Sequence, residues 1–275
     1  MRILCCLNRD IASSVALNLL LPTFAKHQVR VAMSEQVGGA AAFPAEHPDR
    51  RDLRIAEQTL PNDVFFPLIE RAGLPDNGNR YLTFAEVERY RGIRVAALPG
   101  PNSPQGLAEL RDYAPDLILT IRYGAILKPA AISIPKFGVL NLHSGRLPHY
   151  RGMLATFRAL AAGDAEIGCT LHYISDGTID TGAIVNTAST RVTPGRSLLW
   201  HVLALYPVGV QLIADALSDL SRGVPLAAAR QSANEGAYYS HPSMADWDIF
   251  RRRGWVSVHP SDIESIFRRY VTLDP

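Results

Sequence analysis

The chain has 275 residues, of which 47% are hydrophobic and 20% are charged. This length suits one large α/β domain with a small appendage, and the composition excludes a wholly disordered chain. The formal net charge of only +2 lacks the basic excess of proteins that bind phosphate backbones, so we expect no nucleic-acid partner.

The cysteine pattern indicates a reducing compartment. Only three cysteines are present, and Cys5 and Cys6 are adjacent in an apolar, strand-like run, where neighbouring side chains point to opposite faces. The N-terminus shows no basic region followed by an apolar stretch and a cleavage site, and we expect no apolar run of membrane-spanning length. These features predict a cytoplasmic protein with no membrane partner.

The N-terminal residues predict strand, helix and strand. The apolar run 2–7 predicts a strand, and Asp10 is placed to cap a helix over Ile11–Phe24, whose apolar residues recur at helical spacing. Residues 29–33 predict a second strand. This order is typical of the start of a parallel α/β sheet.

Residues 34–90 predict an irregular insert. The stretch 34–61 is rich in Gly, Ala, Pro and charge, and helices are expected only near 63–72 and over Phe84–Arg91.

The remaining pattern predicts the rest of the sheet and its helices. The expected strands cover residues 94–98, 117–121, 139–142, 169–174 and 183–188, and the expected helices cover 104–113, 154–162 and 198–220, with a kink at Pro207. The predicted fold class is α/β, with a mostly parallel twisted sheet and helices on both faces. We expect one domain over residues 1–225 and a small C-terminal subdomain over 226–275.

Two strand ends carry the polar residues that suggest chemistry. In open α/β sheets, ligands bind where strands end at their carboxyl side. Asn141 and His143 close a buried strand, and the two-residue repeat of a strand places them on one face. The loop 176–182 joins two later strands and carries Asp176 and Asp180.

These residue types suit transfer of an acyl-type carbon. Asn141 could donate a hydrogen bond to a tetrahedral oxyanion, and His143 could move protons with Asp180 holding its cation. Each residue also has an ordinary structural interpretation, because a lone histidine is more often structural and Asp176 suits a turn. Ser144 is a poor nucleophile candidate, because the Gly-x-Ser-x-Gly elbow is missing.

Two segments carry a family resemblance. Residues 139–152 resemble an Asn-x-His, Leu-Pro, Arg-Gly segment, and residues 170–184 resemble one ending in Ile-Asp-Thr-Gly. Asp180 follows His143 by 37 positions, as in the folate-dependent formyltransferase superfamily. The chain resembles that superfamily over roughly residues 94–195.

The resemblance implies a Rossmann-like fold and 10-formyltetrahydrofolate as cosubstrate. It implies that Asn141, His143 and Asp180 are catalytic. It also implies that the folate is bound by Tyr123, Gly124, Ala125, Ile126, Leu127, Asp176, Gly177 and Ile179. No Gly-x-Gly-x-x-Gly follows the first strand, so the fold does not imply NAD.

The sequence defines the formyl acceptor less well than the formyl donor. The chain most resembles siderophore hydroxyornithine transformylases, which implies formyl transfer to an amine or hydroxylamine nitrogen such as that of N5-hydroxyornithine. An amino-acid acceptor would need a carboxylate clamp, which arginines supply well. The candidate acceptor-binding residues are Arg9, Asp10, Arg122, Arg146 and Tyr150.

Several alternatives remain at this point. The tail with Tyr238-Tyr239 resembles tails of sugar N-formyltransferases, which would stack a nucleotide base on an aromatic such as Tyr150, Trp247 or Trp255. A formyltetrahydrofolate hydrolase and a non-catalytic folate-binding domain are also open. A metal hydrolase would use His143, His149, His172 and Asp180, but their spacing matches no ligand motif, so we expect no metal. We expect no methionyl-tRNA acceptor, because only about fifty residues follow the catalytic part. A homodimer is left open.

Overall fold

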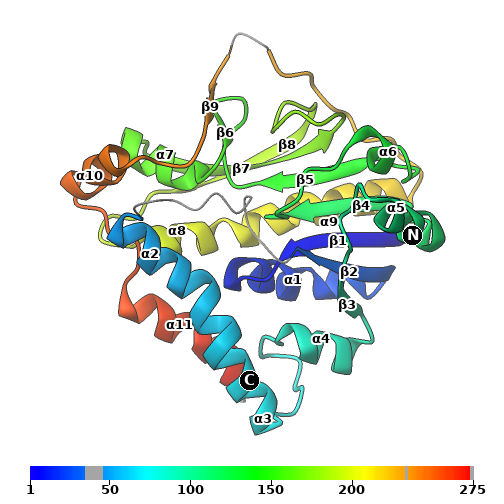
Figure 1. Ribbon diagram of the computed structural model, residues 1–275, viewed down its shortest axis with the longest axis horizontal. Helices are drawn as coiled ribbons and strands as arrows, with labels where there is room; N and C mark the ends of the chain where they lie inside the picture. Colours follow the sequence, from blue (N-terminus) through cyan, green and yellow to red (C-terminus); the bar gives the residue numbers. More distant parts are fainter. Residues whose placement is uncertain (35–45, 233–234, 273–275) are drawn as a thin grey trace.

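The computed structural model describes residues 1–34, 46–232 and 235–272, and its centre is a seven-stranded sheet (Figure 1). The strand order is β3-β2-β1-β4-β5-β7-β8. The strands are β1 (Arg2–Asn8), β2 (Gln28–Ser34), β3 (Arg94–Ala97), β4 (Leu117–Ile121), β5 (Val139–His143), β7 (Glu166–Ile174) and β8 (Ile184–Arg191). The first five are mutually parallel and β7 is antiparallel to β5 and β8, which confirms the predicted mostly parallel α/β fold.

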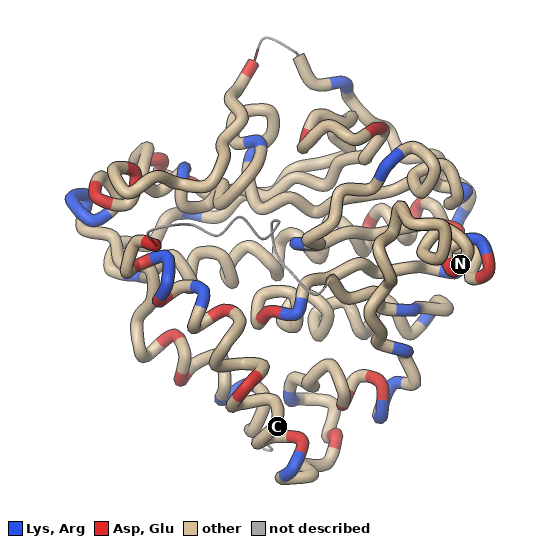
Figure 2. Tube along the Cα trace, viewed as in Figure 1, with Lys and Arg blue, Asp and Glu red and all other residues tan. Residues whose placement is uncertain are grey.

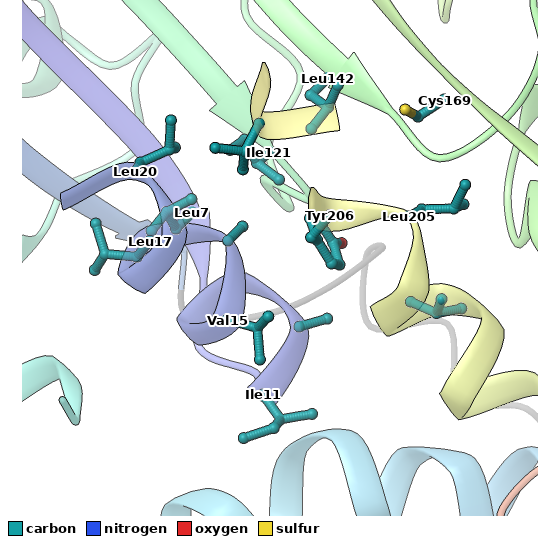
Figure 3. Close-up of a cluster of buried hydrophobic side chains, with 14 of the residues drawn as sticks. Leu7, Ile11, Val15, Leu17, Leu20, Ile121, Leu142, Cys169, Leu205 and Tyr206 are labelled. Carbon is teal, nitrogen blue, oxygen red and sulfur yellow. The ribbon is translucent and has the colours of Figure 1, made fainter. Parts of the chain in front are cut away.

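Alternation along β1 divides the core into two layers. Ile3, Cys5 and Leu7 face one buried cluster, while Leu4 and Cys6 face the other. The first layer lies under α1 (Ile11–Phe24), α8 (Leu198–Ala204) and α9 (Tyr206–Ser221), and Figure 3 shows side chains of these helices meeting the sheet. The second layer lies under α5 (Pro104–Tyr113) and α6 (Pro129–Ile132). Helices therefore cover both faces, as predicted.

The expected irregular stretch before residue 61 is largely helical. Residues 35–45 lie outside the described residues. From residue 48, α2 (Pro48–Arg54), the π-helix η1 (Ile55–Phe65) and α3 (Phe66–Ala72) follow one another, and α4 (Phe84–Arg91) comes later. The prediction is wrong here because burial of side chains such as Leu53 and Ala56 stabilises a helix that the composition does not favour.

The apolar stretch Leu198–Ser221 is 24 residues long and apolar enough, by length and composition, to cross a membrane, contrary to the expectation. The structure explains its composition as packing. It breaks at Leu205 into α8 and α9, with Pro207 in the first turn of α9, where a missing N–H costs nothing. Val202 and Ile213, on either side of the break, are buried in the main core.

The C-terminal residues add one short strand and two helices. β9 (Ala237–Tyr239) pairs with β6 (Tyr150–Gly152), α10 (Met244–Arg252) packs on α7 (Ala155–Ala162), and α11 (Pro260–Val271) reaches α1. Trp247, Phe250 and Tyr270 are fully buried in the same cluster as the sheet residues. The domain boundary at residue 225 stays a prediction, but the helices beyond it share the main core.

Lys and Arg are interspersed with Asp and Glu along the described chain (Figure 2).

Candidate active site at the end of β5

Three polar side chains lie side by side across the sheet. Asn141 on β5 is in register with Thr120 on β4 and with His172 on β7. Thr120 Oγ1 donates to Asn141 Oδ1 (2.8 Å), and Asn141 Nδ2 donates to His172 Nε2 (3.0 Å). These two bonds fix which way the amide of Asn141 faces, with its N–H groups directed toward β7.

His143 lies two residues further on the same face. Its ring is 8% exposed, and Nε2 lies 2.6 Å from the carbonyl oxygen of Tyr150. A carbonyl only accepts, so Nε2 carries the proton and Nδ1 holds the lone pair. Nδ1 faces Asp180 Oδ2 at 3.4 Å. The neutral ring therefore presents its basic nitrogen to the carboxylate.

The loop after β5 requires a glycine. A Cβ on Gly145 would lie 2.5 Å from Ala155 Cβ and 2.7 Å from His143 Nε2. Thr170 holds the loop on β7, because its Oγ1 donates to Gly145 O (2.7 Å) and accepts from Leu147 N (3.1 Å). This packing accounts for the glycine at position 145.

Asp180 is held from three sides. Its backbone is left-handed (φ +56°), and Oδ2 accepts from Gly152 N at 2.8 Å. Oδ1 lies 3.4 Å from His172 Nε2 and 3.5 Å from Asn141 Nδ2. Gln231 Nε2 donates to the carbonyls of Asp180 (2.9 Å) and Gly182 (2.7 Å). The structure thus brings together all three predicted catalytic residues.

Sequence reasoning missed two residues of this cluster. The sequence suggests His172 only as a possible metal ligand, although strand alternation places it opposite Asn141 once the pairing of β5 and β7 is known. Gln231 carries no local signal, because its contacts with Asp180 span 51 positions.

The electrostatics favour a neutral base beside a carboxylate. Burial lowers the pKa of His143 and outweighs the opposing effect of Asp180. Burial acts to raise the pKa of Asp180, but His143, His172 and the Gly152 N–H together hold it below its usual value. At neutral pH the imidazole is uncharged and the carboxylate is ionised.

The two loops predicted to bind folate follow β4 and β7, the strands on either side of β5, and carry exposed aliphatic side chains. Ile126 is 55% exposed and Ile179 is 39% exposed, whereas Leu127 is buried in the second core layer. Asn102 braces the first loop, donating to Ile126 O (2.7 Å) and accepting from Lys128 N (2.7 Å).

The other predicted folate residues lie on the same two loops. Gly124 N donates to Ser34 Oγ (3.0 Å), and Tyr123 packs against the second core layer near Ala125. Asp176 accepts from Thr178 N (2.7 Å), which is the turn-forming role that the sequence suggested for it, and Gly177 follows in that turn.

Arg122 and Asp10 do not face an open site. Arg122, with φ +56°, donates from Nε to Asp10 Oδ2 (2.9 Å) and from Nη2 to Glu57 Oε2 (3.0 Å). Asp10 is fully buried and caps α1 through Ser13 N (2.7 Å), as predicted. Their predicted role in acceptor binding has no support here, because these charges already pair. The side chain of Arg9 is exposed.

Arg146 and Tyr150 share a pocket of about 410 Å³. The pocket is lined by Arg146, His149, Tyr150, Asp164, Gly236, Ala237 and Tyr239. The structure therefore brings together two of the five predicted acceptor residues. Within residues 1–34, 46–232 and 235–272, no group of three His, Cys, Asp or Glu side chains is arranged to hold a metal.

Residues 100–199 match the formyl transferase family, and this range contains Asn141, His143 and Asp180. Over these residues the chain is similar to formyl transferases. It is 35% identical over 182 residues to the methionyl-tRNA formyltransferase of Paraburkholderia phytofirmans, covering 60% of this chain and 55% of the relative. The chain thus spans about half the length of the curated relatives it matches.

Solved structures of formyltransferases share the fold. Glycinamide ribonucleotide transformylase 1 from Symbiobacterium toebii aligns with a TM-score of 0.56 at 16% identity, over 84% of this chain and 94% of that one. An N-formyltransferase from Helicobacter canadensis, in complex with folinic acid and dTDP-3-aminofucose, aligns with a TM-score of 0.53 at 16% identity, over 87% and 71%.

Proposed function

We propose that this chain transfers a formyl group from 10-formyltetrahydrofolate to a nitrogen of a small-molecule amine or hydroxylamine. The observation that carries the proposal is the contact of Asp180 with both Asn141 and His143 at the carboxyl end of β5. This cluster lies inside the segment that matches the formyl transferase family.

Asn141 has a spare hydrogen-bond donor for the transition state. One N–H of its amide is used by His172 at 3.0 Å, and the other has only a 3.5 Å contact with Asp180, which is long for a hydrogen bond. When an amine attacks the formyl carbon, a tetrahedral oxyanion forms, and this second N–H can stabilise it.

His143 and Asp180 carry out the proton transfers. The lone pair on His143 Nδ1 accepts a proton from the attacking nitrogen, and the carboxylate 3.4 Å away stabilises the imidazolium. The same proton then passes to N10 of the folate as its bond to the formyl carbon breaks. One C–N bond forms, one C–N bond breaks, and no covalent enzyme intermediate is needed.

Ile126 and Ile179 support the folate half of the proposal. Both are large apolar side chains left exposed on loops beside the cluster, where a flat heterocycle could cover them. The Helicobacter canadensis structure was determined with folinic acid, a folate, which favours a folate donor for this chain also.

The acceptor we propose is N5-hydroxyornithine, in cytoplasmic siderophore biosynthesis. The resemblance of the loop carrying Arg146 supports this acceptor, and the three free, buried thiols Cys5, Cys6 and Cys169 suit the cytoplasm. A nucleotide-linked amino sugar is the second candidate, because the Helicobacter canadensis enzyme was crystallised with dTDP-3-aminofucose.

The test is tetrahydrofolate release from 10-formyltetrahydrofolate with a panel of acceptors. Asn141→Ala and His143→Ala should abolish acceptor-dependent release, whereas His27→Ala, at the amino edge of the sheet, should not. Undiminished release by the first two variants would overturn the proposal. Stoichiometric formate release without any amine would favour the hydrolase instead.

A further inference from the structure

Arg146 is anchored on the same sheet face as the catalytic cluster. Gly168, Thr170 and His172 alternate along β7 on the face that carries Asn141 and His143. The stem of Arg146 lies directly on Gly168, since a Cβ at that position would be 2.4 Å from Arg146 Cγ. Gly168 is four residues from His172, or about 13 Å along the strand.

The pocket beside this anchor, which we call the Arg146 pocket, holds two opposite charges that do not pair. Its cation is Arg146, which is exposed and forms no ion pair with the residues that the structure describes. Its anion is Asp164, whose Oδ2 accepts from the Tyr150 hydroxyl at 2.7 Å. Asp164 Oδ1 has no donor in the described part of the chain.

An unpaired cation and anion in one pocket match a zwitterion. An α-amino acid offers a carboxylate for Arg146 and an ammonium for Asp164. A phosphate-bearing acceptor would meet the carboxylate of Asp164, and a simple diamine would leave Arg146 without a partner. The mixed charge therefore favours an amino-acid head group over both.

Tyr150 connects the pocket to His143. It lines the pocket, while its carbonyl lies 2.6 Å from His143 Nε2. The pocket and the imidazole therefore lie on two sides of the same residue. An acceptor whose head group occupies the pocket must extend past Tyr150 to reach the catalytic cluster.

We propose that the Arg146 pocket binds the head group of an α-amino-acid acceptor, with Arg146 on the carboxylate and Asp164 on the ammonium, so that the side-chain nitrogen reaches the formyl carbon. This proposal rests on the proposed formyl transfer. It names the acceptor class and assigns specificity to Arg146, Asp164 and Gly168.

The experiment compares L-ornithine, N5-hydroxy-L-ornithine and L-lysine with putrescine, a dTDP-amino sugar and methionyl-tRNA as acceptors. Wild type should prefer an amino acid. Arg146→Ala should raise its KM about 10- to 100-fold, as expected for loss of a charged hydrogen bond, with little change in kcat. The preference for ornithine over putrescine should then disappear, and Arg146→Lys should restore it in part.

Two further variants sharpen the test. Asp164→Asn should raise the KM of the amino acid but not that of an acceptor lacking an α-ammonium. Gly168→Ala keeps every charge but displaces the stem of Arg146, so it should behave as Arg146→Ala does. Arg89→Ala, an exposed arginine on α4, is the matched control and should change nothing.

Direct titration with L-ornithine, without folate, separates this proposal from the proposed function. Binding that weakens in Arg146→Ala supports the pocket even if no formyl transfer is found. Suppose instead that formyl is transferred to a nucleotide sugar or methionyl-tRNA and that amino-acid binding is unaffected by Arg146→Ala. The proposed formyl transfer would then hold, and the proposed role of the Arg146 pocket would be wrong.

Discussion

Two polar clusters lie at the carboxyl ends of the parallel strands, and they differ in how closely their charged groups approach one another. Around Arg122, the carboxylates of Asp10 and Glu57 are bonded at 2.9 and 3.0 Å. Around Asp180, the contacts to His143 and His172 are 3.4 Å. The short ion pairs of Arg122 indicate a structural role, whereas the longer contacts of Asp180 and the spare N–H of Asn141 leave capacity for a substrate. Residue type alone does not separate the two clusters.

His143→Ala is expected to have the largest effect, because His143 belongs to the cluster assigned to catalysis. Loss of a general base should lower kcat by about 10²–10⁴-fold. The free energy of unfolding should fall by only about 1–3 kcal/mol, because the buried ring loses its hydrogen bond with the carbonyl of Tyr150. Steady-state kinetics and urea unfolding of the same preparation measure the two effects. If His143→Ala lost stability and kept its kcat, the cluster around Asp180 would be structural and not catalytic.

Arg122→Met should show the opposite pattern. It leaves the buried carboxylates of Asp10 and Glu57 without their cation, so unfolding should require about 3–5 kcal/mol less than in wild type. Urea titration followed by circular dichroism checks this. Arg89→Met, on the surface of α4, is the control, and equal stability of the two variants would contradict a structural role for Arg122.

The pH profile tests the catalytic cluster without removing its base. The pKa of His143 is held below 6.5 by burial, so kcat/KM should rise with pH through a value below 6.5, where the imidazole becomes neutral. Asp180 opposes that lowering, so Asp180→Asn should move the acid limb to still lower pH, besides reducing kcat. An acid limb that stays in place would mean that another group titrates.

The smallest expected effect belongs to Gln231, which positions Asp180 through its backbone. Gln231→Ala removes two hydrogen bonds and should lower kcat by about 3- to 10-fold, with the KM for folate unchanged. Gln211→Ala, a surface glutamine on α9, is the matched control. A change confined to the melting temperature would make Gln231 merely structural.

Local patterns were sufficient for much of the fold. The strands, the cap at Asp10 and the placement of Asn141 and His143 on one face follow from alternation and capping, which act over a few residues. The sequence does not predict the helical stretch before residue 63, because the stability of that stretch comes from distant packing partners.

The candidate site was predictable to the same extent. The resemblance located Asn141, His143 and Asp180, but the pairing of Arg122 with Glu57 joins residues 65 positions apart. Only the folded chain shows that Arg122 is paired, whereas the exposed Arg146 has no ion pair with the described residues.

The C-terminal helix has a consequence for synthesis. Tyr270 donates to Ser14 Oγ at 2.8 Å, and Arg269 O accepts from Tyr81 N at 2.6 Å, so α11 completes the packing around α1. While the ribosome is still translating the catalytic segment, α11 has not yet been made, so the apolar surface that it covers in the folded chain is exposed. Nascent chains halted before residue 260 should therefore bind chaperones that recognise exposed apolar segments, and release should follow once α11 emerges.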